Sequence, residues 1–98
     1  MTIHQSREAD KIILTIEGRL DTMTAPELEK TMDDILDGVS ELVLDMTQLE
    51  YVSSAGLRVL LKAQKQMDRQ GKMALTGVNE SVMEVFEITG FADILTFE

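Results

Sequence analysis

Cysteine is absent from this chain of 98 residues, which excludes a disulfide framework and any metal site built on thiolates. Tryptophan is absent too, and aromatic residues make up only 4% of the chain, so leucine, isoleucine, valine and methionine must fill the core. No apolar run approaches the ~18 residues of a membrane span, and the N-terminus has no apolar signal segment. We therefore expect a soluble protein of the cytoplasm.

Positive charge is scarce: the chain has nine basic and eighteen acidic residues, for a net charge of −9. This balance argues against nucleic acid and anionic membranes as partners. Residues 58–72 are the exception, because they carry five bases and one acid. Four of these bases keep helical spacing and form one stripe. The stripe is either a solvated face, a contact surface for an acidic partner or a pairing face for a nearby phosphate; its members are Arg58, Lys62, Lys65 and Arg69.

Linkers and internal repeats are also missing, so residues 1–98 are predicted to form one domain. Alternating or continuous apolar runs predict strands, and apolar residues at helical spacing predict helices. The expected strands cover residues 2–7, 11–20, 41–45, 72–76 and 94–97, with a tight turn near Ala9-Asp10 joining the first two. The expected helices cover residues 24–38, 54–70 and 79–90.

Local signals mark the ends of these helices. The run Thr24-Ala-Pro-Glu27 is typical of a capping box with proline in the first turn, where a missing N–H costs nothing. Asn79 or Ser81 is expected to cap the last helix. Glycines are expected to end the three helices, at Gly38, Gly71 and Gly90.

Strands that alternate with helices predict an α/β domain with parallel pairing at its centre, because right-handed crossovers return the chain to the same sheet. The opening hairpin adds an antiparallel pair. The sheet is therefore expected to be mixed, with four or five strands and packed helices.

The most informative stretch joins the buried run Glu41-Leu-Val-Leu-Asp45 to Ser53-Ser-Ala-Gly-Leu57. From Leu57 onward the apolar spacing becomes helical, so a helix must begin at the two serines. A helix N-terminus offers free backbone N–H groups and a positive dipole end. A serine there is either a simple cap or a place where a phosphate would be held comfortably.

Catalysis by a serine nucleophile is a poor match to the same residues. The nucleophile elbow of hydrolases needs Gly-x-Ser-x-Gly, and here position 52 is Val52. The one histidine, His4, is expected on a strand at the other end of the chain, so no base is evident for Ser54. We interpret His4 as an ordinary exposed strand residue.

Two aspartates, Asp21 and Asp45, lie at predicted strand ends, where α/β proteins place functional groups. They could hold a magnesium ion or serve acid–base chemistry. Alternatively, each accepts hydrogen bonds from backbone N–H groups of the following turn. No phosphate-binding loop of the type Gly-x-x-x-x-Gly-Lys-Ser/Thr is present, and no cofactor is predicted.

Three ordered segments resemble a known family. They are Gly18-Arg-Leu-Asp21 with Thr24-Ala25, the run Leu42–Leu61 and the closing Val85-Phe-Glu-Ile-Thr-Gly-Phe91. Together they resemble STAS domains, specifically the small bacterial anti-sigma factor antagonists. Ser53 stands where the family often has aspartate, and Ala55 where it often has a second hydroxyl. Counting back from Gly56, the family's phosphorylated serine falls on Ser54.

The resemblance implies a non-enzymatic, phosphorylation-switched binding module. Unphosphorylated, it would bind an anti-sigma factor that is also a serine kinase and so release a sigma factor. Phosphorylation would end the binding, and a phosphatase would reset the switch. The residues implied in partner binding are Asp21, Thr22, Ser53, Ser54, Ala55, Gly56, Leu57 and Arg58. An alternative is a STAS-like scaffold subunit of a larger signalling assembly that is never phosphorylated, and direct binding of a nucleotide or small ligand is a third possibility without a motif.

Overall fold

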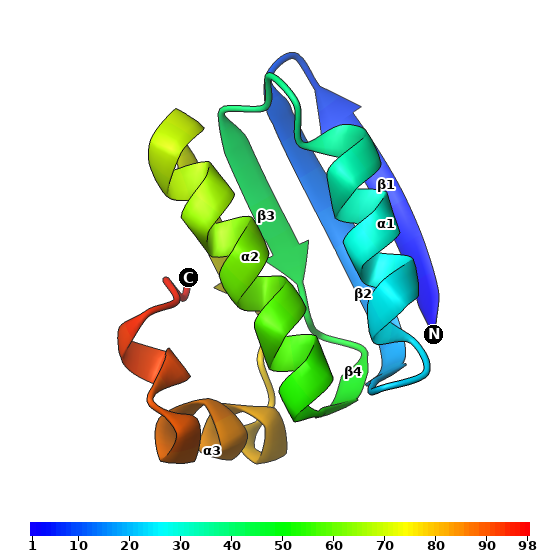
Figure 1. Cartoon of the computed structure of the whole chain (residues 1–98), viewed down its shortest axis with the longest axis vertical. Coiled ribbons are helices and arrows are strands. Elements are labelled where there is room, and N and C mark those ends of the chain that lie inside the picture. Colours follow the sequence, from blue (N-terminus) through cyan, green and yellow to red (C-terminus); the bar gives the residue numbers. More distant parts are fainter.

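Strands and helices alternate along the chain as the sequence predicts (Figure 1). A computed structural model describes all 98 residues. The strands are β1 (Thr2–Glu8), β2 (Lys11–Leu20), β3 (Glu41–Asp45), β4 (Leu49–Val52) and β5 (Lys72–Thr76). The helices are α1 (Ala25–Ile35), α2 (Ser54–Gln70) and α3 (Glu80–Thr89), followed by a short 3₁₀ turn over Phe91–Asp93.

All five strands belong to one mixed sheet, which confirms the predicted fold class. β1 and β2 form an antiparallel hairpin, whose turn passes through Ala9 in the left-handed region at a φ of 51°. β3 pairs with β2 in parallel, and β5 pairs with β3 in parallel, giving the order β1-β2-β3-β5. The end of β2 pairs in parallel with β4 and carries a bulge between Gly18 and Arg19.

The two longer helices cover one face of this sheet (Figure 1). Alternate residues of β2 point toward them: Ile12, Leu14 and Ile16 have no exposed surface. Their neighbours on the other face, Ile13 and Thr15, are half-buried. This period of two matches a strand that has one face in the core. The core therefore lies between the sheet and the pair α1 and α2.

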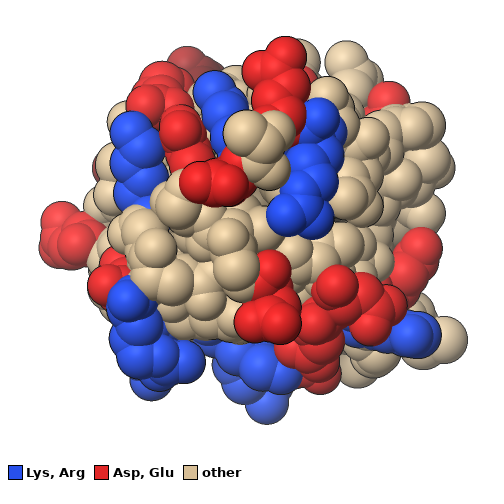
Figure 2. All heavy atoms as spheres, turned by 90° about the horizontal axis from the view of Figure 1, so that it is seen from above, with Lys and Arg blue, Asp and Glu red and all other residues tan.

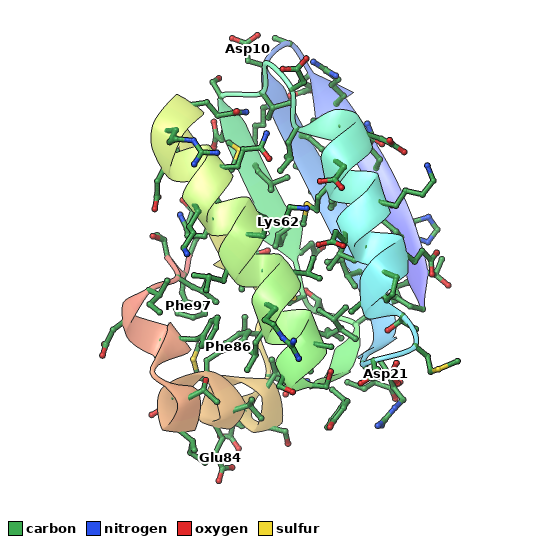
Figure 3. All side chains as sticks on the ribbon, viewed as in Figure 1. Asp10, Asp21, Lys62, Glu84, Phe86 and Phe97 are labelled. Carbon is green, nitrogen blue, oxygen red and sulfur yellow. The ribbon has the colours of Figure 1, made fainter.

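The third helix closes one end of this core. Phe86 of α3 is fully buried, and its ring lies 5.8 Å from that of Phe97, between centroids (Figure 3). The caps of α2 and α3 follow the sequence closely. Asn79 caps α3 by accepting a hydrogen bond from Val82 N at 2.9 Å, and Gly90 ends the helix in the left-handed conformation at a φ of 83°. Such a conformation is easy for glycine alone.

Two strand predictions needed correction. β4 was not expected, because Leu49–Val52 is only four residues long and its pairing reaches only the end of β2. The strand expected over residues 94–97 was wrong: the chain there makes a single parallel bridge between Phe97 and Leu75. Both segments are too short for apolar periodicity to resolve.

The predicted capping box at the start of α1 was also wrong. Thr24 is the N-cap residue, but its side chain bonds backward, to Arg19 and Asp21, and caps no N–H of the helix. α1 ends at Ile35, before the predicted end near Gly38. Leu36 and Val39 are buried, although they lie in the connection that follows the helix.

Candidate functional site

Two segments that are distant in sequence meet at the carboxyl ends of β2 and β4. The first is the loop from Asp21 to Thr24, and the second is the start of α2. A hydrogen bond of 2.9 Å joins them directly, from the backbone N–H of Ser53 to the carbonyl of Leu20. The parallel pairing of Leu20 with Val52 holds the same two strand ends together.

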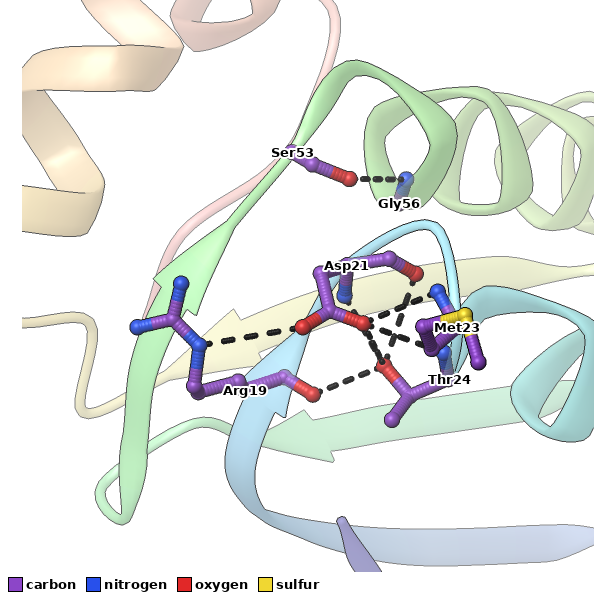
Figure 4. Close-up of polar contacts among 6 residues, drawn as sticks. All are labelled: Arg19, Asp21, Met23, Thr24, Ser53 and Gly56. Atoms are coloured by element: carbon purple, nitrogen blue, oxygen red, sulfur yellow. Dashed lines mark hydrogen bonds and ion pairs between the residues drawn. The ribbon is translucent and has the colours of Figure 1, made fainter.

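Asp21 organises the loop (Figure 4). Its Oδ1 accepts hydrogen bonds from the backbone N–H groups of Met23 at 3.0 Å and Thr24 at 3.1 Å. The Thr24 hydroxyl accepts from Asp21 N and donates to the carbonyl of Arg19, both at 2.8 Å. Arg19 Nε lies 3.7 Å from Asp21 Oδ2. The loop is therefore fixed by its own polar groups.

These contacts also set the charge of Asp21. Partial desolvation alone would raise the pKa of its carboxyl. The hydrogen bonds from Thr24 and Met23, together with the positive charge of Arg19, outweigh that effect and lower the pKa below the ordinary value. Asp21 is thus an ionised acceptor of turn N–H groups, as one of the two interpretations predicted. Asp45 Oδ1 likewise accepts hydrogen bonds from the turn that follows its strand, from Thr47 N at 3.0 Å and from the Thr47 hydroxyl at 2.6 Å.

The two adjacent serines have different roles at the start of α2. Ser53 is the N-cap residue in an extended conformation, and its Oγ accepts a hydrogen bond from Gly56 N at 3.4 Å. Ser54 is the first residue of the helix and is exposed, as expected. Its hydroxyl has no hydrogen-bond partner in the structure. The capping role thus belongs to Ser53, and the hydroxyl of Ser54 takes no part in capping α2.

Gly56 is buried, and its lack of a side chain has a structural cause. A Cβ at this position would lie 2.6 Å from Leu20 Cγ and 3.1 Å from Leu20 O. The glycine therefore lets α2 begin directly against the end of β2. Leu57 is buried as well, at 5% exposure, so both residues position the surface from beneath.

The accessible part of the site is a shallow hollow of about 340 Å³ between the starts of α1 and α2. Of the residues predicted to bind a partner, Thr22, Ala55 and Arg58 line it, along with Ala25, Pro26, Glu29 and Val59. Arg58 lies one turn after Ser54 on the helix and makes no ion pair within the chain. Ser54 and Arg58 are four residues apart and therefore neighbours on one face of α2, and Arg58 reaches the hollow.

Sequence reasoning missed three residues at the edge of this surface. Met23 is 86% exposed in the loop beside Asp21, which is unusual for so large an apolar side chain. Tyr51 is 39% exposed, and the guanidinium of Arg19 lies 4.2 Å from the centre of its ring. Exposed apolar residues of this kind are frequent anchors in protein interfaces. A large apolar residue two positions after Asp21, in a predicted loop, was the one available signal.

The four bases of the predicted stripe are all exposed along the outer side of α2. Together with Leu61 they line a hollow of about 310 Å³. Lys62 is neutralised by Glu29 and Asp33 of α1, each at 3.3 Å, and these bonds raise its pKa. In Figure 2 some blue side chains lie along the lower margin of the view, on the side of the helices, and others lie in its upper half.

Other chemistry predicted as an alternative finds little support at this site. His4 is exposed on β1 and pairs with Glu17, with 3.2 Å between Nε2 and Oε2, on a part of the sheet remote in sequence from Ser54. No group of three or more histidine, aspartate or glutamate side chains is arranged to hold a metal ion. None of the helices has the length and apolar character that crossing a membrane requires.

A mixed sheet with two helices on one face, and a serine-bearing helix start at the ends of its parallel strands, defines an α/β domain of the STAS class. The sequence model described as "STAS domain" matches residues 2–98, so this chain belongs to the STAS domain family.

Named relatives and solved structures agree with this assignment. The anti-sigma-B factor antagonist of Listeria monocytogenes is 32% identical over 94 residues, covering 93% of this chain and 82% of the relative. BtrV of Bordetella bronchiseptica is 40% identical over 85 residues, covering 85% and 73%.

The folds are similar as well. An anti-sigma factor antagonist from Mycobacterium paratuberculosis aligns with a TM-score of 0.87 at 20% identity, covering 98% of this chain and 83% of that one. SpoIIAA of Bacillus in its phosphorylated form aligns with a TM-score of 0.76 at 13% identity, covering 99% and 91%.

Proposed function

We propose that this chain is an anti-sigma factor antagonist: a non-enzymatic binding module of the bacterial cytoplasm that binds an anti-sigma factor and thereby frees a sigma factor. The family and the name of the Listeria relative support the proposal. The binding surface is the one built by Asp21, Thr22 and the segment from Ser53 to Arg58. Met23 and Tyr51 extend it with exposed apolar area.

Phosphorylation of Ser54 is the proposed switch. The anti-sigma factor would be the kinase, using ATP, and a separate phosphatase would remove the phosphate. A phosphoserine carries roughly −1.5 to −2 charges, which the start of a helix tolerates because its N–H groups and dipole favour an anion. The domain therefore need not refold, whereas an interface built around a neutral hydroxyl would have to bury an unpaired charge.

The observation that carries the switch is the free hydroxyl of Ser54, exposed in the first turn of α2 beside the Asp21 loop. Incubation with the cognate anti-sigma factor and ATP, followed by mass spectrometry of the intact chain, tests it. Incorporation of one phosphate is expected. Binding of the anti-sigma factor without incorporation would support the rival scaffold function, and absence of binding would contradict the antagonist function itself.

Ser54, and not Ser53, should receive the phosphate. Ser53 Oγ is engaged with Gly56 N, whereas Ser54 Oγ is unbonded. Peptide mapping should therefore place the phosphate on Ser54. Ser53→Ala should still accept it, although loss of the cap should lower the free energy of unfolding by about 0.5–2 kcal/mol. Phosphate on Ser53, or its persistence in Ser54→Ala, would contradict this assignment.

The basic stripe should speed the encounter with an acidic partner. Lys65 and Arg69 make no ion pair within the chain, so reversing both with Lys65→Glu and Arg69→Glu should slow association about tenfold at low salt and leave dissociation nearly unchanged. The difference should shrink as added salt screens the charges. Surface plasmon resonance gives both rates. Arg7→Glu with Lys30→Glu makes the same change in net charge elsewhere, and an equal effect in that control would favour a merely solvated face.

A further inference from the structure

The last part of the chain is acidic throughout. Residues 73–98 carry five acids and no base. Three of the acids, Glu80, Glu84 and Glu87, lie on α3, and all three are exposed. None of them takes part in an ion pair; the seven pairs of the structure all lie outside this segment.

These glutamates repel one another. Glu80 and Glu84 are four residues apart and Glu84 and Glu87 three apart, so their side chains are neighbours on one helix face. Glu87 also lies in the last turn, where the dipole disfavours negative charge and where α3 has no basic residue. Figure 3 shows Glu84 directed away from the domain and Phe86 directed inward. Only Glu80, in the first turn of α3, is favoured by the helix dipole; Glu84 and Glu87 gain no such stabilisation within the chain.

Apolar surface accompanies the charge. Ile88 follows Glu84 by one turn and is 77% exposed. A hollow of about 470 Å³ is lined by Val78 and Met83 together with the three glutamates. A second hollow, of about 300 Å³, continues from it over the same Val78 and Met83 to Phe97 at the end of the chain. The face is thus an apolar groove with an acidic rim.

We propose that this α3 face docks a cationic amphipathic helix of a protein partner. Lysines or arginines of such a helix would neutralise the three glutamates. Its apolar side chains would cover Val78 and Met83, which line both hollows, and would reach Ile88 beyond the row of glutamates. Three turns of α3 span about 15 Å, which matches two to three turns of a docked helix. Nucleic acid and anionic membranes have the wrong sign of charge for this face.

The α3 face is separate from the surface around Ser54. Its two hollows share no lining residue with the hollow that contains Thr22 and Arg58. Docking on α3 therefore does not require the proposed switch, and the domain has room to hold a second partner while Ser54 is covered. If binding is not found at one surface, binding at the other can still be tested.

The probe is a synthetic peptide of about 14 residues with leucines on one helical face and lysines on the other, titrated into the ¹⁵N-labelled full chain and followed by NMR. Amide shifts are expected to concentrate on residues 78–88. A peptide with glutamate in place of each lysine should cause none. Ser54→Asp should bind the lysine peptide as the unchanged chain does.

Variants separate this docking from general attraction between opposite charges. Glu84→Lys with Glu87→Lys should weaken peptide binding at least about tenfold and raise Tm by roughly 1–4 °C, because repulsion on α3 is relieved. Ile88→Ser should also weaken binding, by about threefold or more. Glu8→Lys with Asp37→Lys is the matched control, since both residues are exposed and unpaired and the net charge changes equally.

Three outcomes would overturn the proposal. Shifts spread over all acidic surfaces, or equal weakening in the Glu8 and Asp37 control, would mean that the peptide senses net charge alone. Shifts in residues 78–88 that grow with protein concentration without peptide would assign the face to a second copy of this chain. Unchanged affinity of the peptide for Ile88→Ser would contradict an apolar contact between the docked helix and this face.

Discussion

Ser54→Asp is expected to fold normally and to bind the anti-sigma factor about 100-fold more weakly than the unchanged chain. The charge lies at the first residue of α2, where the helix dipole stabilises it, so Tm should not fall. Within the interface the same charge loses water without gaining a partner, which costs several kcal/mol, and each 1.4 kcal/mol is about tenfold in affinity. Isothermal titration calorimetry and thermal unfolding measure the two quantities.

Ser54→Ala is the matched control, because it removes the hydroxyl and adds no charge. It should bind within about threefold of the unchanged chain and resist release by ATP. Its stability should barely change, since the cap of α2 is provided by Ser53. Equal weakening in both variants would mean that the hydroxyl itself is needed for contact, and strong binding by Ser54→Asp would refute an electrostatic switch.

Gly56→Val should destabilise the domain by about 3 kcal/mol. Even a single Cβ would lie 2.6 Å from Leu20 Cγ, in a fully packed region, and overpacking of this kind typically costs about 1–3 kcal/mol. Valine adds two more methyl groups and lacks the helix propensity that would partly offset the cost in alanine. Urea unfolding followed by circular dichroism gives the free energy.

A double-mutant cycle identifies the cause. Leu20→Ala removes the two nearest side-chain atoms that a Cβ at Gly56 would meet, and leaves the Leu20 carbonyl oxygen at 3.1 Å. Gly56→Ala should therefore cost clearly less in the Leu20→Ala background than in the unchanged chain. Additive effects would show that Leu20 is not the obstacle. Anti-sigma factor binding by the folded fraction of Gly56→Ala should weaken too, because the start of α2 must shift away from the Asp21 loop.

Most of the fold could be predicted because long apolar patterns determine it. β3 and β5 have the predicted bounds, and α2 begins at the predicted serine, since each element buries a continuous or periodic apolar set. β4 could not be predicted, because Leu49–Val52 is stabilised by pairing with the end of β2 and not by a pattern of its own. The final bridge at Phe97 has the same non-local origin.

The features of the candidate site also divide into those that local sequence predicts and those that depend on tertiary contacts. The hydrogen bonding of Asp21 follows from local rules about turns and was one of the two alternatives that the sequence left open. The exposure of Ser54 agrees with its place at the start of a helix. The role of Gly56 depends on Leu20, which only the tertiary structure brings near. Met23 leaves no periodic trace because an exposed loop residue belongs to no pattern.

The hydrogen bond between Ser53 and Leu20 joins stretches of chain that are separated by α1, β3 and β4. A kinase that contacts both the Asp21 loop and the start of α2 can therefore recognise its target only after the intervening elements have folded. A nascent or unfolded chain displays the same serine without the second half of the surface. Phosphorylation would then be restricted to correctly folded molecules, and these are the copies able to compete for the partner.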